Sequence, residues 1–442
     1  MIKMTDKKIK ILIVPSDSQG VGHFRSIWPA QALTTHFGEE FDVEINLSPN
    51  MDNLAYLKQF DIIHFHRHLG PYETMEKNFA ELKAAGVTLM MDIDDFWEPP
   101  TTHPLYQIVK QEKLGEKIIK TMQLSDYITT TTDIFAKEIS KYNKNVIIMP
   151  NALNMDDKMW KSEVMQNETD RCRISWIGGS SHFNDLKLLE PSMAALYRNK
   201  ELENKFQIIM CGFDIRGSIT EIKPDGSRST RAILPHETIW LKFEEIFTNK
   251  YSDVKKDEEY FKWLNKIKKE EYSGQYSKSY IRRWTLPLTQ YGKHYDYCDV
   301  CLAPIDSIDE YRTDKGQLIK RINKFNEVKS ELKIIEAGMK KKCLIAQDFG
   351  IYSQLLENGK TGILIKDNKD GWYKAMKKVI LDPAYRQELA NNLHEYVKDK
   401  YELKIVTANR AIIYKDILLT KNIDATKAII EAKLEEEAKL NS

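Results

Sequence analysis

The sequence predicts an α/β protein of two tandem domains, each built around a mostly parallel sheet. Short apolar runs alternate with amphipathic stretches along the first part of the chain, which is the pattern of successive βαβ units. The same opening, a buried run followed by a glycine loop and a helix, occurs at residues 9–37 and again at residues 172–198. At 442 residues the chain is also too long for one core and suits two or three domains.

Composition narrows the function classes. The chain has 66 Lys and Arg against 65 Asp and Glu, so no overall field directs it to nucleic acid or to an anionic membrane. The first apolar run, ILIVP, is too short for a signal peptide or a membrane span, and no other window is long enough. Five scattered cysteines indicate a reducing compartment rather than a disulfide framework. We therefore expect a cytoplasmic protein without a transmembrane segment.

The first glycine loop is a candidate binding site. It follows the predicted strand 9–14, and Gly20 and Gly22 allow the backbone to turn tightly before a helix whose start can receive a phosphate or carboxylate. The third glycine of a dinucleotide fingerprint is missing. His23 and Arg25 can donate hydrogen bonds to an anion or a sugar, although a plain loop histidine and a surface arginine remain the alternative.

Three histidines alternate along the predicted strand FDIIHFHRHLG. His64, His66 and His68 lie on one side of such a strand. Zinc is one interpretation, but no carboxylate lies in the same run. We interpret His66 as a polar contact that points into a cleft, and the others as structural.

The strand VTLMMD is followed by the carboxylates Asp94 and Asp95, with Asp92 at its end. These residues suit a general base, a metal site or a substrate clamp, and they equally suit caps of the following loop and helix. Further strands at 41–46, 127–132 and 145–149 and helices at 72–86 and 113–126 complete the first α/β half.

The second half begins near residues 156–171. Its predicted strands lie at 172–177, 205–214, 296–304, 342–348 and 361–365. We assign domains to residues 1–165 and 166–405, and a helical segment with a charged tail to residues 406–442. The pattern fails at about 214–285, which we interpret as an insertion on the acceptor side or a packing element, and again at 306–328. Cys298 and Cys301 form a C-x-x-C in an apolar run without a second pair at zinc spacing, so we expect buried thiols.

A local basic excess lies between Arg312 and Lys342, with ten Lys and Arg against four Asp and Glu. It could neutralise a diphosphate or face a polyanionic acceptor such as DNA or a charged glycan, and a solvated helix face is the alternative. This stretch contains KSELKIIEAGMKKKCLIA, predicted as a helix that ends at Gly338 and is followed by a strand. Lys333 and Glu336 are three residues apart on one helix face near the end of a sheet.

Together, GVGHFR, WIGGSSHFNDL and KSELKIIEAGMKKKCLIAQDFGIYSQLLENGKTGILI resemble GT-B fold glycosyltransferases of the retaining "group 1" kind, including phage and bacterial members. The resemblance covers about residues 8–415 without the insertion. It implies two Rossmann-like domains that face each other across a cleft. It also implies sugar transfer from a UDP- or GDP-linked donor, with retention and without a metal or other cofactor. The acceptor would be a glycan, a lipid-linked glycan or a modified base in phage DNA, which would place the protein in the host cytoplasm. A non-catalytic nucleotide- or sugar-binding relative is the alternative.

The resemblance also implies roles for residues of these motifs. Glu336 would bind the ribose hydroxyls of the donor. The phosphates would lie near Lys333, Lys329, Ser330, Arg283 and the second glycine loop, which contains Gly178, Gly179, Ser180 and His182. The sugar end would meet Gly20, Gly22, His23 and Arg25, with His66 and Asp95 along the cleft. His66, Arg283 and Lys333 would be the catalytic residues. The family often has a second Glu eight residues before the first, and this chain has Val328 there.

Overall fold

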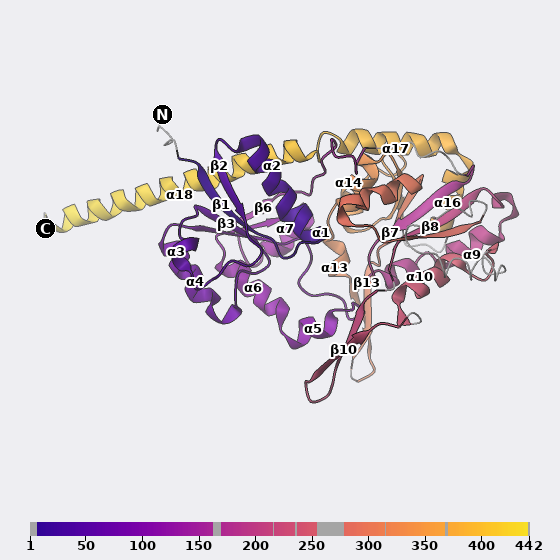
Figure 1. Cartoon of the computed structure of the whole chain (residues 1–442), viewed down its shortest axis with the longest axis horizontal. Coiled ribbons are helices and arrows are strands. Elements are labelled where there is room, and N and C mark those ends of the chain that lie inside the picture. The colour runs from indigo at the N-terminus through magenta and orange to yellow at the C-terminus, as the bar shows by residue number, and fades with distance from the viewer. Residues whose placement is uncertain are drawn as a thin grey trace. The chain divides into compact units, whose positions relative to one another are not determined.

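The computed structural model describes residues 7–161, 169–214, 216–234, 237–253, 278–313, 315–366 and 370–440 (Figure 1). The chain forms two compact units. Unit 1 comprises Met1–Asp94, Lys113–Ala152 and Tyr401–Ser442, and unit 2 comprises Asp95–Glu112 and Leu153–Lys400. Each unit contains a parallel six-stranded sheet, so the expected α/β fold is confirmed. Within the described residues, no helix is both long and apolar enough to span a membrane.

Unit 1 has the strand order β2-β1-β3-β4-β5-β6. The strands are β1 (Ile9–Val14), β2 (Phe41–Ile45), β3 (Ile62–His66), β4 (Thr88–Asp92), β5 (Tyr127–Thr130) and β6 (Val146–Ile148). Central strands such as β3 and β4 are buried along their whole length, which is why they read as continuous apolar runs. The strand order reverses between β1 and β3, and the first glycine loop follows β1 at this switch point.

The helices of unit 1 cover this sheet. They are α1 (Gly20–Gly22), a π-helical turn (His23–Ile27), α2 (Trp28–Phe37), α3 (Leu54–Leu57), α4 (Tyr72–Ala84), α6 (Leu114–Leu124), α7 (Asp133–Ile139) and α18 (Leu403–Leu440). Ala411, Tyr414 and Ile417 of α18 are buried in the same core as Ile11 and Phe41. This part of the C-terminal helix therefore packs in the core of unit 1, whereas the sequence predicted a separate helical segment.

Unit 2 has the strand order β11-β8-β7-β12-β15-β16. The strands are β7 (Cys172–Ile177), β8 (Phe206–Phe213), β11 (Tyr280–Trp284), β12 (Val300–Ala303), β15 (Cys343–Gln347) and β16 (Ile363–Ile365). Its helices are α5 (Tyr106–Gln111), α8 (Phe183–Lys187), α9 (Glu190–Arg198), α10 (Ile239–Thr248), α13 (Lys324–Glu327), α14 (Leu332–Met339), α15 (Gly350–Leu355), α16 (Gly371–Leu381) and α17 (Pro383–Val397), with 3-10 turns at Lys200–Leu202 and Leu288–Tyr297. The strand order reverses between β7 and β12, so the second glycine loop also lies at a switch point.

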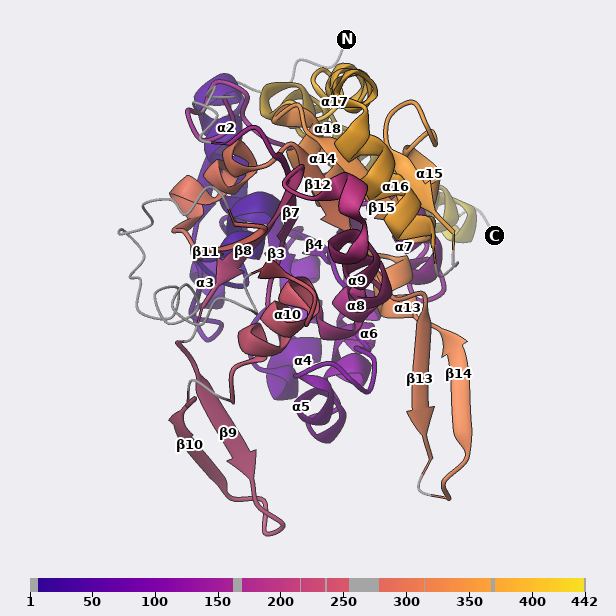
Figure 2. The ribbon, with the colours of Figure 1, turned by 90° about the vertical axis from the view of Figure 1, so that its right-hand side faces the viewer.

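Two antiparallel ribbons project from unit 2 (Figure 2). One pairs β9 (Ser218–Ile222) with β10 (Arg228–Ala232), and the other pairs β13 (Ile308–Arg312) with β14 (Leu318–Ile322). The expectation of irregular structure at these segments is wrong, because alternating residues flank the turn residues Pro-Asp-Gly and Asp-Lys-Gly. The segment expected as an insertion also ends in β11, which is an edge strand of the main sheet.

The helix α14 contradicts one further expectation, since it continues through Gly338 to Met339. A Cβ at Gly338 would lie 2.5 Å from Cγ2 of Val397, so the glycine allows close packing against α17. The chain turns instead at Lys341, whose φ is 53°.

Candidate functional site

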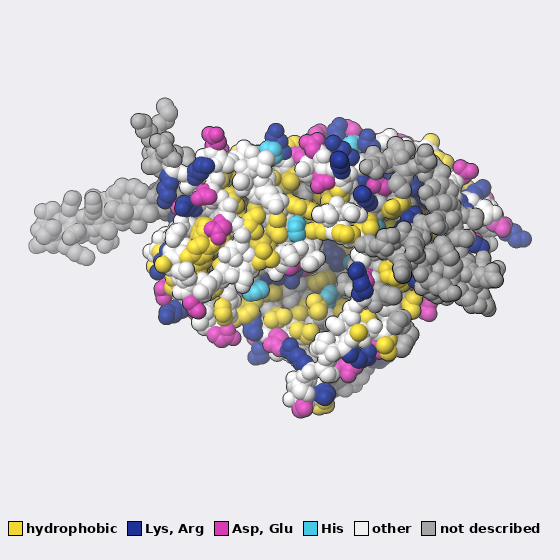
Figure 3. Space-filling model, in the orientation of Figure 1, with side chains coloured by type: hydrophobic (Ala, Val, Ile, Leu, Met, Phe, Trp, Pro, Cys, Tyr) yellow, Lys and Arg dark blue, Asp and Glu magenta, His cyan; other side chains and the backbone are white. Residues whose placement is uncertain are grey.

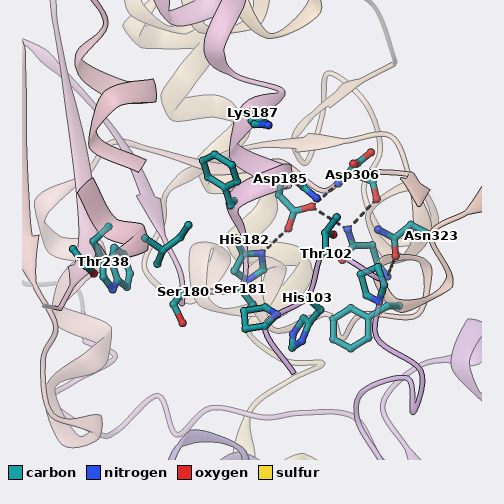
Figure 4. Close-up of a pocket in the computed structure, with 18 of the residues that line it drawn as sticks. Thr102, His103, Ser180, Ser181, His182, Asp185, Lys187, Thr238, Asp306 and Asn323 are labelled. Carbon is teal, nitrogen blue, oxygen red and sulfur yellow. Dashed lines mark hydrogen bonds and ion pairs between the residues drawn. The ribbon is translucent and has the colours of Figure 1, made fainter. Parts of the chain in front are cut away.

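A cavity of about 1110 Å³ lies in unit 2 beside the carboxyl ends of β7 and β12 (Figure 4). Ser180 and His182 from the loop after β7 line it, as does Asp306 from the loop after β12. In open parallel sheets, ligands bind in the crevice where the strand order reverses. The cavity is therefore the candidate binding site of this unit.

Asp185 connects three segments at the wall of this cavity. Its Oδ2 is 2.7 Å from Nδ1 of His182, and its Oδ1 accepts from the backbone N–H of Asp306 at 2.6 Å and from Nδ2 of Asn326 at 2.9 Å (Figure 4). Burial and the charge of Lys329 lower the pKa of His182. A neutral imidazole that donates Nδ1–H to Asp185 keeps Nε2 as a hydrogen-bond acceptor.

Two lysines bring positive charge to the cavity. Lys329 Nζ lies 4.9 Å from the ring centre of Phe325, and Lys187 Nζ lies 4.8 Å from that of Phe183. Neither ammonium has a hydrogen bond or ion pair with the residues that the structure describes. Burial and Lys329 lower the pKa of nearby His103 to about 4, so this second cavity histidine is neutral at pH 7.

Lys333 and Glu336 form a separate cluster that does not line the cavity. Lys333 Nζ donates to Tyr291 Oη at 2.8 Å, Tyr295 Oη at 3.2 Å and Glu336 Oε2 at 3.0 Å, so all three ammonium hydrogens have acceptors. Although burial opposes it, Glu336 raises the pKa of Lys333 well above its usual value. Glu336 is fully buried, and its Oε1 has no partner among the described residues.

The remaining predicted residues of unit 2 also lie outside the cavity lining. Gly178 allows close packing, because a Cβ there would lie 2.4 Å from the Trp176 ring, whereas Gly179 faces open space. The Arg283 guanidinium stacks 3.8 Å from the ring centre of Tyr297. Ser330 and Asp95 are partly buried.

In unit 1, two of the predicted site residues, Arg25 and His66, form pairs with carboxylates at or just after the end of β4. Arg25 is buried and makes a bidentate pair with Asp92, at 2.6 Å and 3.0 Å, and also donates to the Met149 carbonyl. Arg25 thus has a carboxylate partner at the end of β4. His66 Nε2 lies 2.9 Å from Asp94 Oδ1, and its Nδ1 is buried without a partner in the described part of the chain.

The first glycine loop is held by Asp17. Its Oδ1 accepts from the N–H groups of Gln19 and Gly22, and a Cβ at Gly22 would lie 1.8 Å from the Asp17 carbonyl oxygen. Gly20 faces open space, and His23 Nδ1 donates to the Gln19 carbonyl at 2.9 Å. Hydrogen bonds within the loop thus fix its conformation.

The histidines of β3 have different hydrogen-bond partners. His64 bonds to Tyr414 and Thr129, which makes it structural as predicted. Across the described ranges, no group of three or more His, Cys, Asp and Glu side chains is placed to hold a metal ion. Cys298 and Cys301 are buried, with their sulfur atoms 3.6 Å apart.

The basic stretch from Arg312 to Lys342 does not form one surface. Among the residues that the structure describes, five of its ten cations pair with carboxylates, namely Lys320, Arg321, Lys324, Lys333 and Lys340. The face of the molecule in Figure 3 likewise mixes cationic and anionic side chains. Among the cations of the stretch, Lys329 lines the cavity.

Sequence reasoning missed His103, Lys187 and Asp185 as members of the site. Asp185 and Lys187 stand in the motif WIGGSSHFNDLK, so their nearness to the glycine loop was a usable signal. His103 comes from a loop of the segment 95–112, and its sequence carries no signal for joining unit 2.

Comparisons with known proteins agree with this fold. No protein-family model matches the sequence, and no curated protein matches it significantly. Sucrose-phosphate synthase from Thermosynechococcus elongatus aligns with a TM-score of 0.57 at 12% identity, over 94% of this chain and 100% of that one. HepE from Anabaena in complex with UDP gives 0.57 at 10% identity, over 93% and 100%.

A glycosyltransferase from Rickettsia africae gives a TM-score of 0.56 at 14% identity, over 93% of this chain and 99% of that one. These identities are low, so the likeness concerns the fold. The chain has the GT-B fold of glycosyltransferases, as the resemblance in its sequence implied.

Proposed function

We propose that this protein is a glycosyltransferase that moves a sugar from a nucleotide-sugar to an acceptor. The observation that carries the proposal is the cavity at the switch point of unit 2, where Lys329 and Lys187 lack carboxylate partners among the described residues. A nucleoside diphosphate supplies the negative charge that such ammonium groups bind. The GT-B fold supports the same reading.

The reaction breaks the bond between the anomeric carbon and the diphosphate oxygen and forms one between that carbon and an acceptor oxygen, whose proton passes to the leaving diphosphate. Negative charge therefore grows on the leaving oxygen in the transition state. Lys329, placed in the cavity without an anionic partner, stabilises this charge as it develops. In this proposal the ammonium groups take the role that a metal ion has in other sites. The sugar configuration is retained without a protein nucleophile, as in the group that the sequence resembles.

The sequence resemblance assigns the ribose contact to Glu336, but this side chain is fully buried and lies outside the cavity lining, so the proposed phosphate site at Lys329 and Lys187 does not include it. Its Oε1 is buried without a hydrogen-bond partner among the described residues, and Oε2 accepts from Lys333 and Tyr295. Lys333 thus fixes the position of the Glu336 carboxyl group. Sugar donors based on UDP are the first to test, because HepE was solved with UDP and with UDP-glucose, and GDP-sugars come next.

The test measures nucleotide release from UDP-, GDP- and other nucleotide-sugars by the full-length protein. We expect Lys329→Ala to lower kcat/KM by about 100-fold, since loss of one charge-stabilising donor costs this much in comparable sites. Lys315→Ala is the matched control, because Lys315 is exposed in the turn between β13 and β14. Equal turnover by wild type and Lys329→Ala would refute the assignment of the phosphate site.

Nucleotide binding without any release or transfer would favour the non-catalytic relative instead. The acceptor is a glycan, a lipid-linked glycan or a base in DNA. Binding to duplex DNA that weakens steeply with salt would support the last. With half of the basic stretch already in ion pairs, we favour a glycan.

A further inference from the structure

The base of the β13–β14 ribbon contributes a buried carboxylate with one unused oxygen. Asp309 is only 4% exposed. Arg321 donates Nε–H to its Oδ2 at 3.0 Å, and Nη2 of Arg321 lies 3.0 Å from the same oxygen. Its Oδ1 has no hydrogen-bond partner among the residues described. A buried carboxylate oxygen without a donor is unfavourable, so this atom calls for a ligand or solvent donor.

Asn323 provides a donor in the same place. It follows β14 directly, its N–H donates to the Ser307 carbonyl at 2.9 Å, and its Oδ1 accepts from the Asn326 N–H at 3.2 Å. These contacts fix the orientation of the amide, while Nδ2 makes no hydrogen bond within the described ranges. Asp309 and Asn323 both line the large cavity and an adjoining one of about 100 Å³.

Phe325 adds an apolar surface. Its ring lines the same two cavities, and the Lys329 ammonium lies 4.9 Å from its centre. A free acceptor, a free donor and an aromatic ring are the groups that recognise a sugar ring, whose edge carries hydroxyls and whose face carries C–H groups.

We infer that Asp309, Asn323 and Phe325 form a subsite for a pyranose sugar. Asp309 Oδ1 accepts from one hydroxyl, Asn323 Nδ2 donates to a neighbouring hydroxyl oxygen, and the Phe325 ring packs against the C–H face. The inference rests on the proposed function, because the sugar of a nucleotide-sugar is joined to the phosphate that Lys329 would neutralise. The same chemistry also fits the terminal sugar of a glycan acceptor, and the experiment separates the two.

The test compares full-length wild type and Asp309→Asn by calorimetry and saturation-transfer NMR. The probes are free UDP and GDP, a panel of UDP- and GDP-sugars, and methyl glycosides of the same sugars. An Asn that keeps its oxygen against Arg321 turns an N–H₂ toward the cavity, so a donor replaces the acceptor. We expect about tenfold or greater weakening for sugar-containing probes and no change for the free nucleotides.

The pattern of loss identifies the source of the sugar. Weakening that is confined to nucleotide-sugars assigns the subsite to the donor, and weakening of the methyl glycosides assigns it to the acceptor. Asp309→Asn binding every probe as tightly as wild type would overturn the inference and assign Oδ1 to water. If the wild type binds no nucleotide, the proposed function is wrong. The methyl glycosides still test the sugar subsite in that case.

Two control variants guard against loss of the ribbon itself. Glu310→Gln changes the neighbouring residue, whose carboxylate pairs with Lys320 at 2.6 Å on the opposite face of the ribbon. Arg321→Lys keeps a cation beside Asp309 Oδ2 and leaves Oδ1 unchanged. Both variants should bind sugars more tightly than Asp309→Asn, and Glu310→Gln should bind them like wild type. If Glu310→Gln weakens sugar binding as much as Asp309→Asn, the effect comes from ribbon pairing and the inference is wrong.

Discussion

Each unit has a glycine loop where its strand order reverses, but charged side chains there are paired in unit 1, whereas two lysines in unit 2 are unpaired within the described part of the chain. In unit 1, between β1 and β3, Arg25 binds Asp92 and His66 binds Asp94, and the cavity bordered by Arg25 has a volume of about 10 Å³. In unit 2, between β7 and β12, the space is about 1110 Å³, and Lys187 and Lys329 lack anionic partners among the described residues. The same topology therefore produces a closed polar core in one unit and an open site in the other.

This contrast predicts which charged residues contribute to stability and which to ligand binding. Paired buried charges are costly to break, because removal of one partner leaves the other without compensation. Unpaired charges in a cavity contribute little to folding and are available to a ligand. Substitutions at the switch point of unit 1 should thus lower stability, and those in unit 2 should mainly lower affinity and turnover.

The largest effect should come from Arg25→Ala. Asp92 would be left buried without its guanidinium partner, so we expect a loss of about 3–5 kcal/mol in the free energy of unfolding, measured by chemical denaturation. The surface pair of Lys10 and Asp42, at 3.9 Å, provides the control, and Lys10→Ala should cost less than about 1 kcal/mol. Similar costs for both variants would remove the distinction between a closed core and a surface pair.

Next in size is the pH dependence contributed by His64. Burial lowers the pKa of His64 from 6.5 to about 4, so the unfolded chain binds more protons than the folded one between these pH values. Stability should therefore rise from pH 4 to pH 6.5, by up to about 3 kcal/mol from this group, and level off above. In His64→Gln the denaturation midpoint should change much less with pH across this window. A midpoint that rises with pH as steeply as in wild type would contradict the assignment.

A smaller effect is expected from Asp185→Asn in unit 2. The amide would donate to Nδ1 of His182 and move the imidazole proton to Nε2, so the cavity loses an acceptor. We expect about a tenfold fall in kcat/KM, with a change in stability of only about 1–2 kcal/mol.

The pH profile distinguishes this role from a structural one. Asp185 raises the pKa of His182, against the larger lowering by burial, so its loss should shift the acid limb of kcat/KM to lower pH. Glu190→Gln, an exposed change in the first turn of α9, is the control. An acid limb that stays in place would show that His182 takes no part in binding or catalysis.

The sequence by itself determined the two parallel sheets and the i,i+3 contact of Lys333 with Glu336. Apolar runs and helical spacing depend on local geometry, and local geometry is visible in the order of residues. Alternating residues on each side of a turn also indicate the two ribbons, where we expected irregular structure.

The tertiary structure decided which polar groups stay free. Arg25 meets Asp92 from 67 residues away, and Asp185 meets Asn326 from 141 residues away. Such pairs form only because loops distant in sequence lie at the same edge of a sheet. The periodicity of the sequence does not show which loops meet at that edge. For the same reason the sequence indicated Arg25 and Lys329 alike as ligand contacts, and folding gave one a carboxylate partner and left the other in the cavity.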